Sequence, residues 1–401
     1  MLPAFHLILI CAAQVGTDKL PLRAESPQAS ADWPSFRGNV HLTGVSAGRL
    51  PETLSLRWTF RAPEAITSTA AIVDGVVYVG CDDGALYALS LADAAVRWKY
   101  ATTNAIRSSP SVHRGVVYFG NDDGELHAVN AASGEKKWMY KTDGEIISSV
   151  NVGASGAAGA NDAGGSAGSD GLLFFGSYDD HLYALRVADG SLAWKYQTAG
   201  RVHGTPSVVG DRVLVAGCDE FLHVVSARDG KVVQTVSLGS MSGASAAVAD
   251  GRAYAGTYGN QVVAVDVSAG RTVWTFEDKE RPFPFLSSAA VTDKAVIVGG
   301  RDKRVRALAI ADGKLLWEVV TGGRVDGSPV VCGTRVYIGS GDGNVYVLDV
   351  GSGREVWRYE SGAGISASPA IGGDRLVIGN EDGALLCFGE AAAAREGAGK
   401  E

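Results

Sequence analysis

Short runs of apolar or alternating residues, each about five residues long, follow one another along most of the chain, separated by turns rich in Gly, Asp and Ser. One stretch, residues 108–140, contains four of them, which read SSPSV, VVYFG, ELHAV and KKWMY. Runs of this length bounded by turn residues predict β-strands. The turns at 122–124 and 132–134 are short, and short connections make successive strands antiparallel. We therefore expect a four-stranded antiparallel unit.

This unit repeats, and a tryptophan marks its last strand. Five of the seven steps between successive marks are 40 residues, and Gln234 stands where an eighth tryptophan would fall. The seven tryptophans are Trp58, Trp98, Trp138, Trp194, Trp274, Trp317 and Trp357. Four short strands per roughly 40 residues, repeated around an axis, are typical of a β-propeller.

Counting the units predicts an all-β, eight-bladed propeller over residues 54–390. Seven complete sets of four runs extend from about residue 68 to residue 359, and the last set has only three. The run 56–60 has no set of its own, so this N-terminal strand is expected to complete the last blade. Closing the ring in this way removes the exposed edge that an open stack of blades would leave.

The end of the unit carries a motif, A-x-[DN]-x-x-[ST]-G-x-x-x-W, complete at 128–138 and with one change each at 264–274 and 347–357. It resembles the repeat of the pyrroloquinoline-quinone (PQQ) type propellers, and the leader DWPSFRGN at 32–39 resembles the segment that precedes many of them. In that family such tryptophans dock neighbouring blades together. The resemblance does not imply one function. The family contains quinone-dependent dehydrogenases, the non-catalytic lipoprotein propeller of the outer-membrane barrel assembly machinery, and uncharacterised exported proteins.

The catalytic members set a clear chemical requirement. A PQQ enzyme holds a planar tricarboxylate with several cationic groups and an aromatic floor, and it needs a calcium site and an Asp base. The first strand of each blade lines the channel, and the residues at its start are Thr67, Arg107, Ile147, His203, Gly243, Leu286, Asp326 and Ser366. This column holds one Arg and no Trp, and the chain has no vicinal cysteine pair. We therefore expect no catalytic residue, metal or cofactor; a PQQ- and calcium-dependent dehydrogenase is the alternative.

The same column provides the candidate ligand-binding residues. Arg107, His203 and Asp326 are its bulky polar members, and the two positions that follow them are nearly all small, as expected where eight strands converge. We expect these three side chains to face a ligand at the channel mouth. The alternative is a water-filled channel with solvated side chains.

Acidic residues recur at the second turn of the blades, for example at 82–83, 122–123 and 179–180. Strand direction places these turns on the same face as the connections between blades, which predicts an acidic rim. Asp and Gly tolerate the positive φ of tight hairpin turns, so turn chemistry explains them better than metal binding does. Such a rim would favour a basic partner.

Two segments break the period. Residues 153–171 have the composition of a flexible linker and interrupt the third blade. Residues 277–285, EDKERPFPF, lie between the fifth and sixth blades. Their Phe283 and Phe285 are expected either to contact a partner or to tuck onto the propeller rim.

Charge and the N-terminus complete the picture. The 401-residue chain has a net charge of −8 and no basic block, which argues against nucleic acid or an anionic membrane as a partner. Residues 5–13, FHLILICAA, are too short to span a membrane and are typical of a signal peptide ending at Ala13. Lipid anchoring at Cys11 is disfavoured because the bulky Ile10 precedes it. A leader over 14–53 and a disordered tail over 391–401 are also expected.

These observations favour an exported, periplasmic or secreted, monomeric propeller that binds a protein or peptide as a non-catalytic scaffold. Cell-envelope or outer-membrane protein assembly is the setting that the resemblance suggests. The alternatives are the PQQ-dependent dehydrogenase and a propeller that senses a small molecule or polysaccharide.

Overall fold

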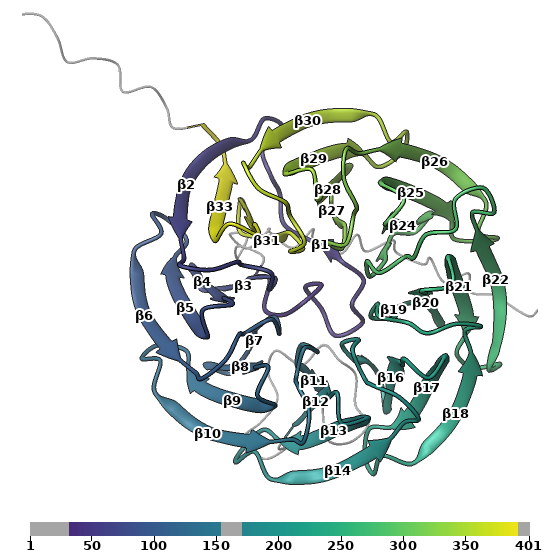
Figure 1. Ribbon diagram of the computed structural model, residues 1–401, viewed down its shortest axis with the longest axis horizontal. Helices are drawn as coiled ribbons and strands as arrows, with labels where there is room; N and C mark the ends of the chain where they lie inside the picture. Colours follow the sequence, from purple (N-terminus) through teal and green to yellow (C-terminus); the bar gives the residue numbers. More distant parts are fainter. Residues whose placement is uncertain (1–31, 154–170, 392–401) are drawn as a thin grey trace, which may run out of the picture.

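The computed structural model describes residues 32–153 and 171–391. The expected signal peptide, Cys11, nearly all of the 153–171 insertion and all but the first residue of the tail lie outside these ranges. Within them every regular element is a β-strand, and no helix is long and apolar enough to cross a membrane. Eight sheets surround a central axis, which confirms the predicted eight-bladed propeller (Figure 1).

Each blade is a four-stranded antiparallel meander, and in blades 1 to 7 the strands are consecutive from the axis outward. The first four blades are β3 (Ala71–Val73), β4 (Val76–Gly80), β5 (Ala85–Ser90), β6 (Val96–Ala101); β7 (Ser111–His113), β8 (Val116–Gly120), β9 (Glu125–Asn130), β10 (Lys136–Lys141); β11 (Asn151–Gly153), β12 (Leu172–Gly176), β13 (His181–Arg186), β14 (Leu192–Gln197); and β15 (Ser207–Val209), β16 (Arg212–Ala216), β17 (Phe221–Ser226), β18 (Val232–Ser237). The next three are β19 (Ala247–Ala249), β20 (Arg252–Gly256), β21 (Gln261–Asp266), β22 (Arg271–Glu277); β23 (Ala290–Val291), β24 (Ala295–Gly300), β25 (Arg304–Ala309), β26 (Leu315–Val320); and β27 (Val330–Cys332), β28 (Arg335–Gly339), β29 (Asn344–Asp349), β30 (Glu355–Glu360).

Blade 8 joins the two ends of the chain. It consists of β31 (Ala370–Gly372), β32 (Arg375–Gly379) and β33 (Ala384–Gly389), with β2 (Ser55–Arg61) as its outermost strand. The β2–β33 pairing is antiparallel and places Trp58 opposite Cys387. The predicted ring closure by strand 56–60 is therefore confirmed, with one further residue at each end.

The tryptophans on the outermost strands connect consecutive blades. The indole Nε1 of Trp98 donates a hydrogen bond of 3.0 Å to the carbonyl of Ala131, in the last turn of the next blade. Its ring fills the space beside Gly134, where an added Cβ would lie 2.7 Å from the indole. Gln234 reproduces the same bond with its amide Nε2, which donates to the Val267 carbonyl. At six of the eight repeat positions, those of Trp58, Trp98, Trp194, Gln234, Trp274 and Trp317, the side chain donates a hydrogen bond to the next blade in this way.

Trp357 differs from the other tryptophans. Blade 8 has no continuous last turn for it to reach, because β2 comes from the other end of the chain. Its ring instead stacks on Tyr359 and meets the edge of Phe388. Aromatic packing thus takes the place of the turn contact at the closure.

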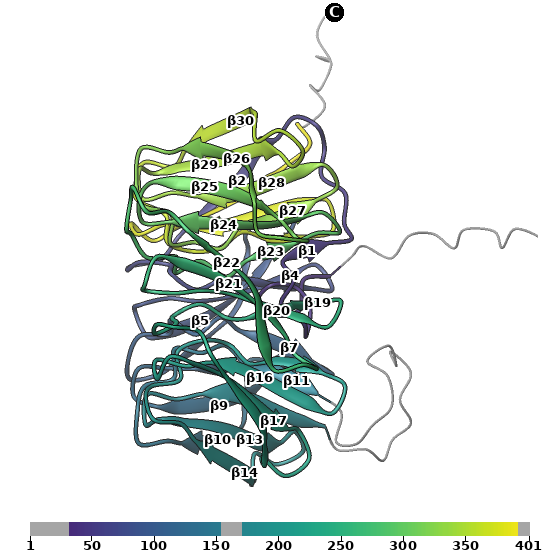
Figure 2. The same cartoon turned by 90° about the vertical axis from the view of Figure 1, so that its right-hand side faces the viewer.

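The leader runs across the face of the propeller opposite the one seen in Figure 1, as the side view in Figure 2 shows. Its β1 (Val45–Ser46) pairs in parallel with β27. Backbone or side-chain hydrogen bonds connect residues 33–46 with the innermost strand of every blade, at Ile72, Val112, Asn151, Val208, Val248, Val291, Val331 and Ile371. Residues 32–46, expected to be part of a linker, are thus an integral part of the fold that lies across one end of the channel.

Candidate channel-mouth site

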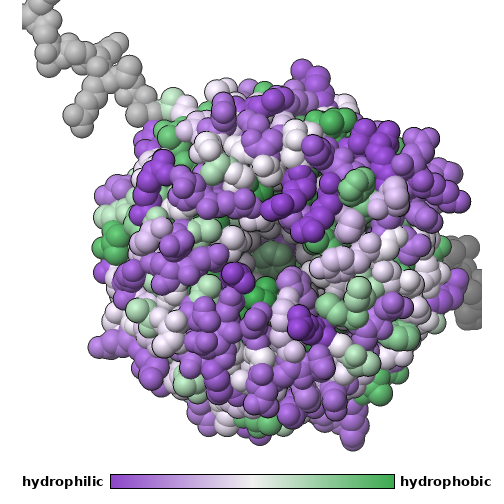
Figure 3. All heavy atoms as spheres, viewed as in Figure 1, coloured by the Kyte–Doolittle hydropathy of each residue, from purple (hydrophilic) through white to green (hydrophobic). Residues whose placement is uncertain are grey.

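The turns between the second and third strands of each blade surround the channel mouth together with the connections between blades. In all eight blades a turn N–H donates to a carbonyl of the connection that enters that blade, at 2.8–3.1 Å, as in the bond from Tyr178 to Glu145. The turns and connections therefore share one face, as the strand directions predicted. Figure 3 shows this face as mainly hydrophilic, with a hollow at the axis.

The acidic side chains of these turns are held in place by the following strand. The Asp342 carboxylate accepts a 2.6 Å hydrogen bond from the Tyr346 hydroxyl, and Asp83 accepts one of the same length from Tyr87. Burial and the adjacent Asp342 together raise the pKa of Tyr346 to about 12. Asp179, Asp219 and Asp302 have equivalent partners four residues later, in Tyr183, His223 and Arg306. At these turns the acidic residues are anchored parts of the fold.

Arg107 lies between two of the turns. Its Nη1 is 3.0 Å from Asp122 and its Nε is 3.8 Å from Asp82, so the side chain bridges blades 1 and 2. Burial raises the pKa of Asp122, and Arg107 opposes that effect. The guanidinium remains about half exposed, with 48% of its side chain accessible.

His203 belongs to a separate aromatic group. Its Nδ1 and the Tyr178 hydroxyl share a 2.6 Å hydrogen bond, and the Arg201 guanidinium stacks 4.9 Å from the centre of the Tyr178 ring. Burial lowers the pKa of His203 and raises that of Tyr178 to about 12. The imidazole and the phenol are therefore both neutral near pH 7.

Asp326 is enclosed by arginines. Arg301 donates to both of its carboxylate oxygens, at 2.8 and 3.0 Å, and Arg324 Nε lies 3.0 Å away. Arg324 also approaches Glu381 at 3.6 Å. Arg107, His203 and Asp326 each contact a turn of the mouth face, but they lie on three different blades and have separate partners, so they do not form one cluster.

The two phenylalanines of the 277–285 segment have different environments. Phe283 is 50% exposed, whereas Phe285 is 1% exposed. The Cζ atom of Arg306 lies over the Phe285 ring, 5.5 Å from its centre. Phe285 therefore cannot contact a partner, and the expectation that it does so is wrong. Its burial follows from its place in the repeat, where its backbone and Cβ close against Gly256 just as the isoleucine at 106 closes against Gly80.

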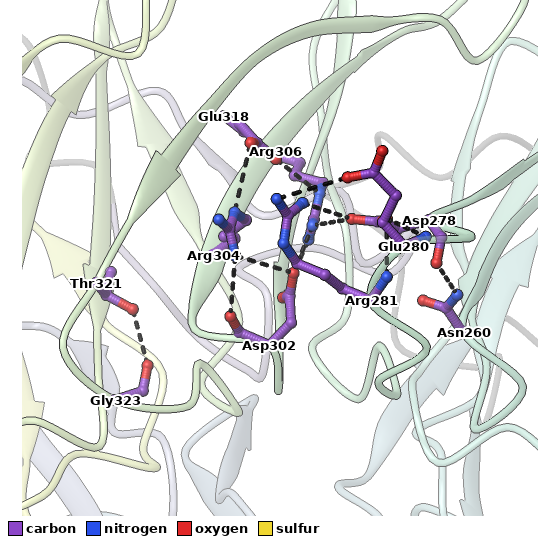
Figure 4. A network of polar contacts seen from close by, with 10 residues as sticks. All are labelled: Asn260, Asp278, Glu280, Arg281, Asp302, Arg304, Arg306, Glu318, Thr321 and Gly323. Carbon is purple, nitrogen blue, oxygen red and sulfur yellow. Dashed lines mark hydrogen bonds and ion pairs between the residues drawn. The ribbon is translucent and has the colours of Figure 1, made fainter.

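An ion-pair network holds this segment on the rim (Figure 4). Arg306 is 1% exposed and lies 2.7 Å from Asp278 and 3.4 Å from Glu318, and it also contacts Asp302. The Asn260 amide donates to the Asp278 carbonyl at 2.6 Å. Charged groups from β25, from β26 and from the loops that contain Asp278 and Asp302 thus fix the loop that presents Phe283.

Three further exposed apolar side chains lie in or next to the turns and connections of blades 4 and 5, and column analysis of the first strand did not identify them. Phe221, Met241 and Tyr258 are 40%, 44% and 43% exposed. The Tyr258 N–H donates to the Met241 carbonyl, and the Thr257 carbonyl accepts from the N–H of Phe285. We name Phe221, Met241, Tyr258 and Phe283 the apolar mouth patch. Comparing the turn residues across the repeat would have revealed Tyr258, which stands where blade 1 has Asp82.

The mouth does not fit PQQ. The three carboxylates of that cofactor require free cationic groups, but Arg107 is engaged by Asp82 and Asp122, and Arg301 by Asp326. The tryptophans of the repeat lie on the outermost strands, away from the axis, so they supply no aromatic floor. Within residues 32–153 and 171–391, no group of three His, Cys, Asp or Glu side chains is arranged to hold a metal ion.

Known proteins share the fold but cover different functions. The chain is 28% identical to outer membrane protein assembly factor BamB of Yersinia pestis over 169 residues, which are 39% of this chain and 43% of that protein. It is 27% identical to quinohemoprotein alcohol dehydrogenase of Comamonas testosteroni over 138 residues, 30% of this chain and 20% of that enzyme. The aligned part therefore spans less than half the length of either relative.

Solved structures agree on the architecture. The crystal structure of BamB from Moraxella catarrhalis has a TM-score of 0.68 at 21% identity and covers 86% of this chain and 100% of that one. The crystal structure of quinohemoprotein alcohol dehydrogenase from Comamonas testosteroni has a TM-score of 0.71 at 14% identity, and it covers 92% of this chain and 82% of that one. The sequence profile described as outer membrane protein assembly factor BamB matches residues 51–161, 141–278 and 219–398. Because these matches extend over nearly the whole propeller, the chain belongs to the BamB family of PQQ-like β-propellers.

Proposed function

We propose that this protein is an exported, non-catalytic scaffold that binds a protein or peptide segment on its mouth face. The observation that carries the proposal is the apolar mouth patch. Its four side chains are 40–50% exposed; Met241, Tyr258 and Phe283 come from loops of blades 4 to 6, and Phe221 begins β17 of blade 4. Exposed aromatic and Met side chains grouped on one face are typical of protein interaction sites.

The charges around the patch add specificity. Arg201 lies on the same side of the mouth as Tyr258 and Tyr178, whereas Asp82 and Asp122 lie on the opposite side. A bound segment would therefore contact apolar and basic groups at one end and acidic groups at the other. Such a pattern selects orientation more than affinity.

Family membership supports the setting. The relatives named as assembly factors act in outer membrane protein assembly, and a comparable role in the cell envelope is the one we propose here. The same fold also serves quinohemoprotein dehydrogenases. We do not propose that chemistry, because three arginines of this mouth, Arg107, Arg301 and Arg324, are already paired with carboxylates.

Site-specific cross-linking tests the proposal. A photoreactive amino acid replaces Tyr258 or Phe283 in the full chain expressed in its own host, and as a matched control it replaces the equally exposed Leu315 on the outer wall. We expect defined adducts with an envelope protein or peptide from the two mouth positions only. Serine substitutions at Met241 and Phe221 should weaken these adducts. Equal labelling from Leu315, or no adduct from either mouth position, would contradict the proposal.

Cell fractionation tests the proposed export, and an activity assay tests the proposed lack of catalysis. A tagged full-length chain should be recovered from the periplasm or medium, and cytoplasmic retention would argue against export. The purified protein incubated with PQQ and calcium should show no dye-linked oxidation of alcohols or sugars. Robust oxidation would replace the scaffold function with the dehydrogenase alternative.

A further inference from the structure

The outermost strand of blade 4 differs in charge from the outermost strands of the other blades. β18 reads VVQTVS and contains no Lys, Arg, Asp or Glu. Each of the other seven outermost strands contains at least one of them: Arg57 in β2, Lys99 in β6, Lys137 in β10, Lys195 in β14, Arg271 in β22, Glu318 in β26 and Arg358 in β30. Charged side chains on an edge strand oppose pairing with a further strand. Blade 4 lacks this protection.

The edge formed by β18 is also apolar and unpaired. Val232 and Val233 are 53% and 47% exposed, and Thr235 and Ser237 are exposed as well. Among residues 32–153 and 171–391, β17 is the only strand that pairs with β18, and no other backbone segment hydrogen-bonds to its backbone. In an antiparallel pair, alternate residues direct their N–H and C=O groups away from the partner strand. β18 therefore presents a row of backbone donors and acceptors on the outside of the blade.

β26 shows that exposed apolar residues alone do not leave an edge unprotected. Its Leu315, Leu316 and Val320 are 45–62% exposed. Glu318 lies among them, and 32% of its side chain is accessible. A strand added to β26 would have to remove water from this carboxylate, which is costly. Blade 4 has Thr235 at the same repeat position, so it lacks this barrier.

The β18 edge leads to the apolar mouth patch. β18 runs toward the mouth face, because the connection that follows it lies there, and its last residue, Ser237, pairs with Phe221 of the patch. Directly opposite residues of an antiparallel pair have Cβ atoms about 5 Å apart, on the same face of the sheet. Met241, another member of the patch, comes shortly after the end of β18. An extended segment along β18 would therefore have one end beside the patch.

The size of the edge decides between a second copy of the chain and an extended segment. Two copies paired through β18 would share a strip of six residues, roughly 20 Å long. Figure 1 shows β18 on the convex outer wall, so two rigid propellers would touch little beyond this strip. Stable interfaces bury about 800 Å² on each partner, far more than such a strip provides. An extended segment avoids this limit, because it can follow both the edge and the patch.

We propose that β18 is a docking edge for an extended, uncharged segment of a partner protein or peptide, which joins blade 4 as a fifth, antiparallel strand. This role rests on the proposed function, which supplies the partner. Main-chain hydrogen bonds give an added strand its affinity, and its alternate side chains give it selectivity. Because the added strand is antiparallel to β18, its N-terminal end lies at the mouth, where apolar side chains contact Phe221.

Fluorescence polarisation with the full chain tests the docking edge. The probe is a labelled octapeptide of alternating Val and Thr, carried on a short polyethylene-glycol tail. Thr235→Lys gives blade 4 the residue type that blades 1 and 3 have at the same repeat position, in Lys99 and Lys195, so the variant should fold. It should weaken binding at least about tenfold, because an added strand would have to remove water from the new charge. Thr275→Lys makes the same change in blade 5 and should leave binding unchanged.

Modified probes test the geometry of the added strand. Only alternate residues of the peptide donate their N–H groups to β18. N-methylation of either all Val or all Thr residues should therefore weaken binding at least about tenfold, while N-methylation of the other set leaves it unchanged. A pair of Phe residues added at the N-terminal end should tighten binding about threefold, and the same pair at the C-terminal end should not. Phe221→Ser should remove this gain.

Four results would overturn this docking edge. They are no binding of the octapeptide to the unmodified chain, equal binding to Thr235→Lys, equal weakening by Thr235→Lys and Thr275→Lys, and equal loss with both N-methylated probes. Sedimentation of the unmodified chain as a dimer that Thr235→Lys dissociates would assign the edge to a second copy, and would equally refute the added peptide strand. None of these results changes the cross-links from Tyr258 and Phe283, so a failure here is distinguishable from a failure of the proposed function.

Discussion

Replacing one of the repeat tryptophans measures how much the contacts between neighbouring blades stabilise the propeller. Trp317 is 8% exposed, its Nε1 donates to the Val350 carbonyl at 2.8 Å, and its ring packs on Gly353 of blade 7. Removing a buried Trp side chain costs about 3–5 kcal/mol through lost burial and the cavity left behind. The lost hydrogen bond adds about 1 kcal/mol. We therefore expect Trp317→Ala to lower the free energy of unfolding by about 4–6 kcal/mol.

The matched variant is Gln234→Ala, at the one repeat position where an amide replaces the indole. It removes the same type of donor, to Val267, but much less apolar surface, so its cost should be about 1 kcal/mol. Trp138→Ala should fall between the two, because Trp138 is only partly buried and its Nε1 has no partner among the described residues. Urea unfolding followed by far-UV circular dichroism compares the three. Equal costs for Trp317→Ala and Gln234→Ala would refute the argument from burial, and Trp138→Ala should leave binding at the mouth intact.

Three other perturbations follow from contacts described above. Hydrogen bonds from Tyr346 and from backbone N–H groups lower the pKa of Asp342 despite its burial. The ionised carboxylate therefore stabilises the fold at pH values above the pKa of an unfolded Asp, about 4, and this stabilisation is lost as the pH falls through the lower pKa of the folded state. Asp342→Asn should therefore flatten the fall in unfolding free energy between pH 6 and pH 3, as urea titrations at each pH would show; an unchanged slope would contradict this. Gly353→Ala places a Cβ 2.7 Å from the neighbouring indole at a φ of +72°, so the midpoint of thermal unfolding should drop, and an unchanged midpoint would refute the packing. Arg306→Ala leaves buried carboxylates without their counter-charge and should cost about 3–5 kcal/mol in urea unfolding, against less than about 0.5 kcal/mol for the exposed Arg228→Gln; similar costs for both would show that the network contributes little.

The fold could be predicted from the sequence because equivalent positions recur at a nearly fixed spacing in every blade. The spacing from Trp58 to Trp357 gave the number of blades, and the unpaired run at 56–60 gave the closure. The same comparison placed Arg107, His203 and Asp326 at the mouth. It also contained the information that Phe285 is buried, since this residue occupies the column of the isoleucines that close against the second strand.

Features that occur once were much harder to predict. The path of the leader has no repeat to define it, so the hydrogen bond from Arg37 to the Ala289 carbonyl of blade 6 depends on tertiary structure alone. The partners of Arg107 and Asp326 come from turns in their own and neighbouring blades, such as Asp82 and Arg301, and the first-strand column does not include those turns. The face of the propeller on which the turns lie was predictable from strand direction. The partners of side chains that occur in only one blade were not.

The closure of blade 8 has a consequence for when the molecule can finish folding during synthesis. The leader and β2 are made first, yet β2 pairs with β33, which is made more than three hundred residues later. Until β33 emerges, β2 has no edge to join and the leader lacks blade 8 as a neighbour. Contacts of such long sequence separation form late and slowly. Each newly made chain therefore remains an open ring until β33 is complete, and β2 takes its place in blade 8 only then.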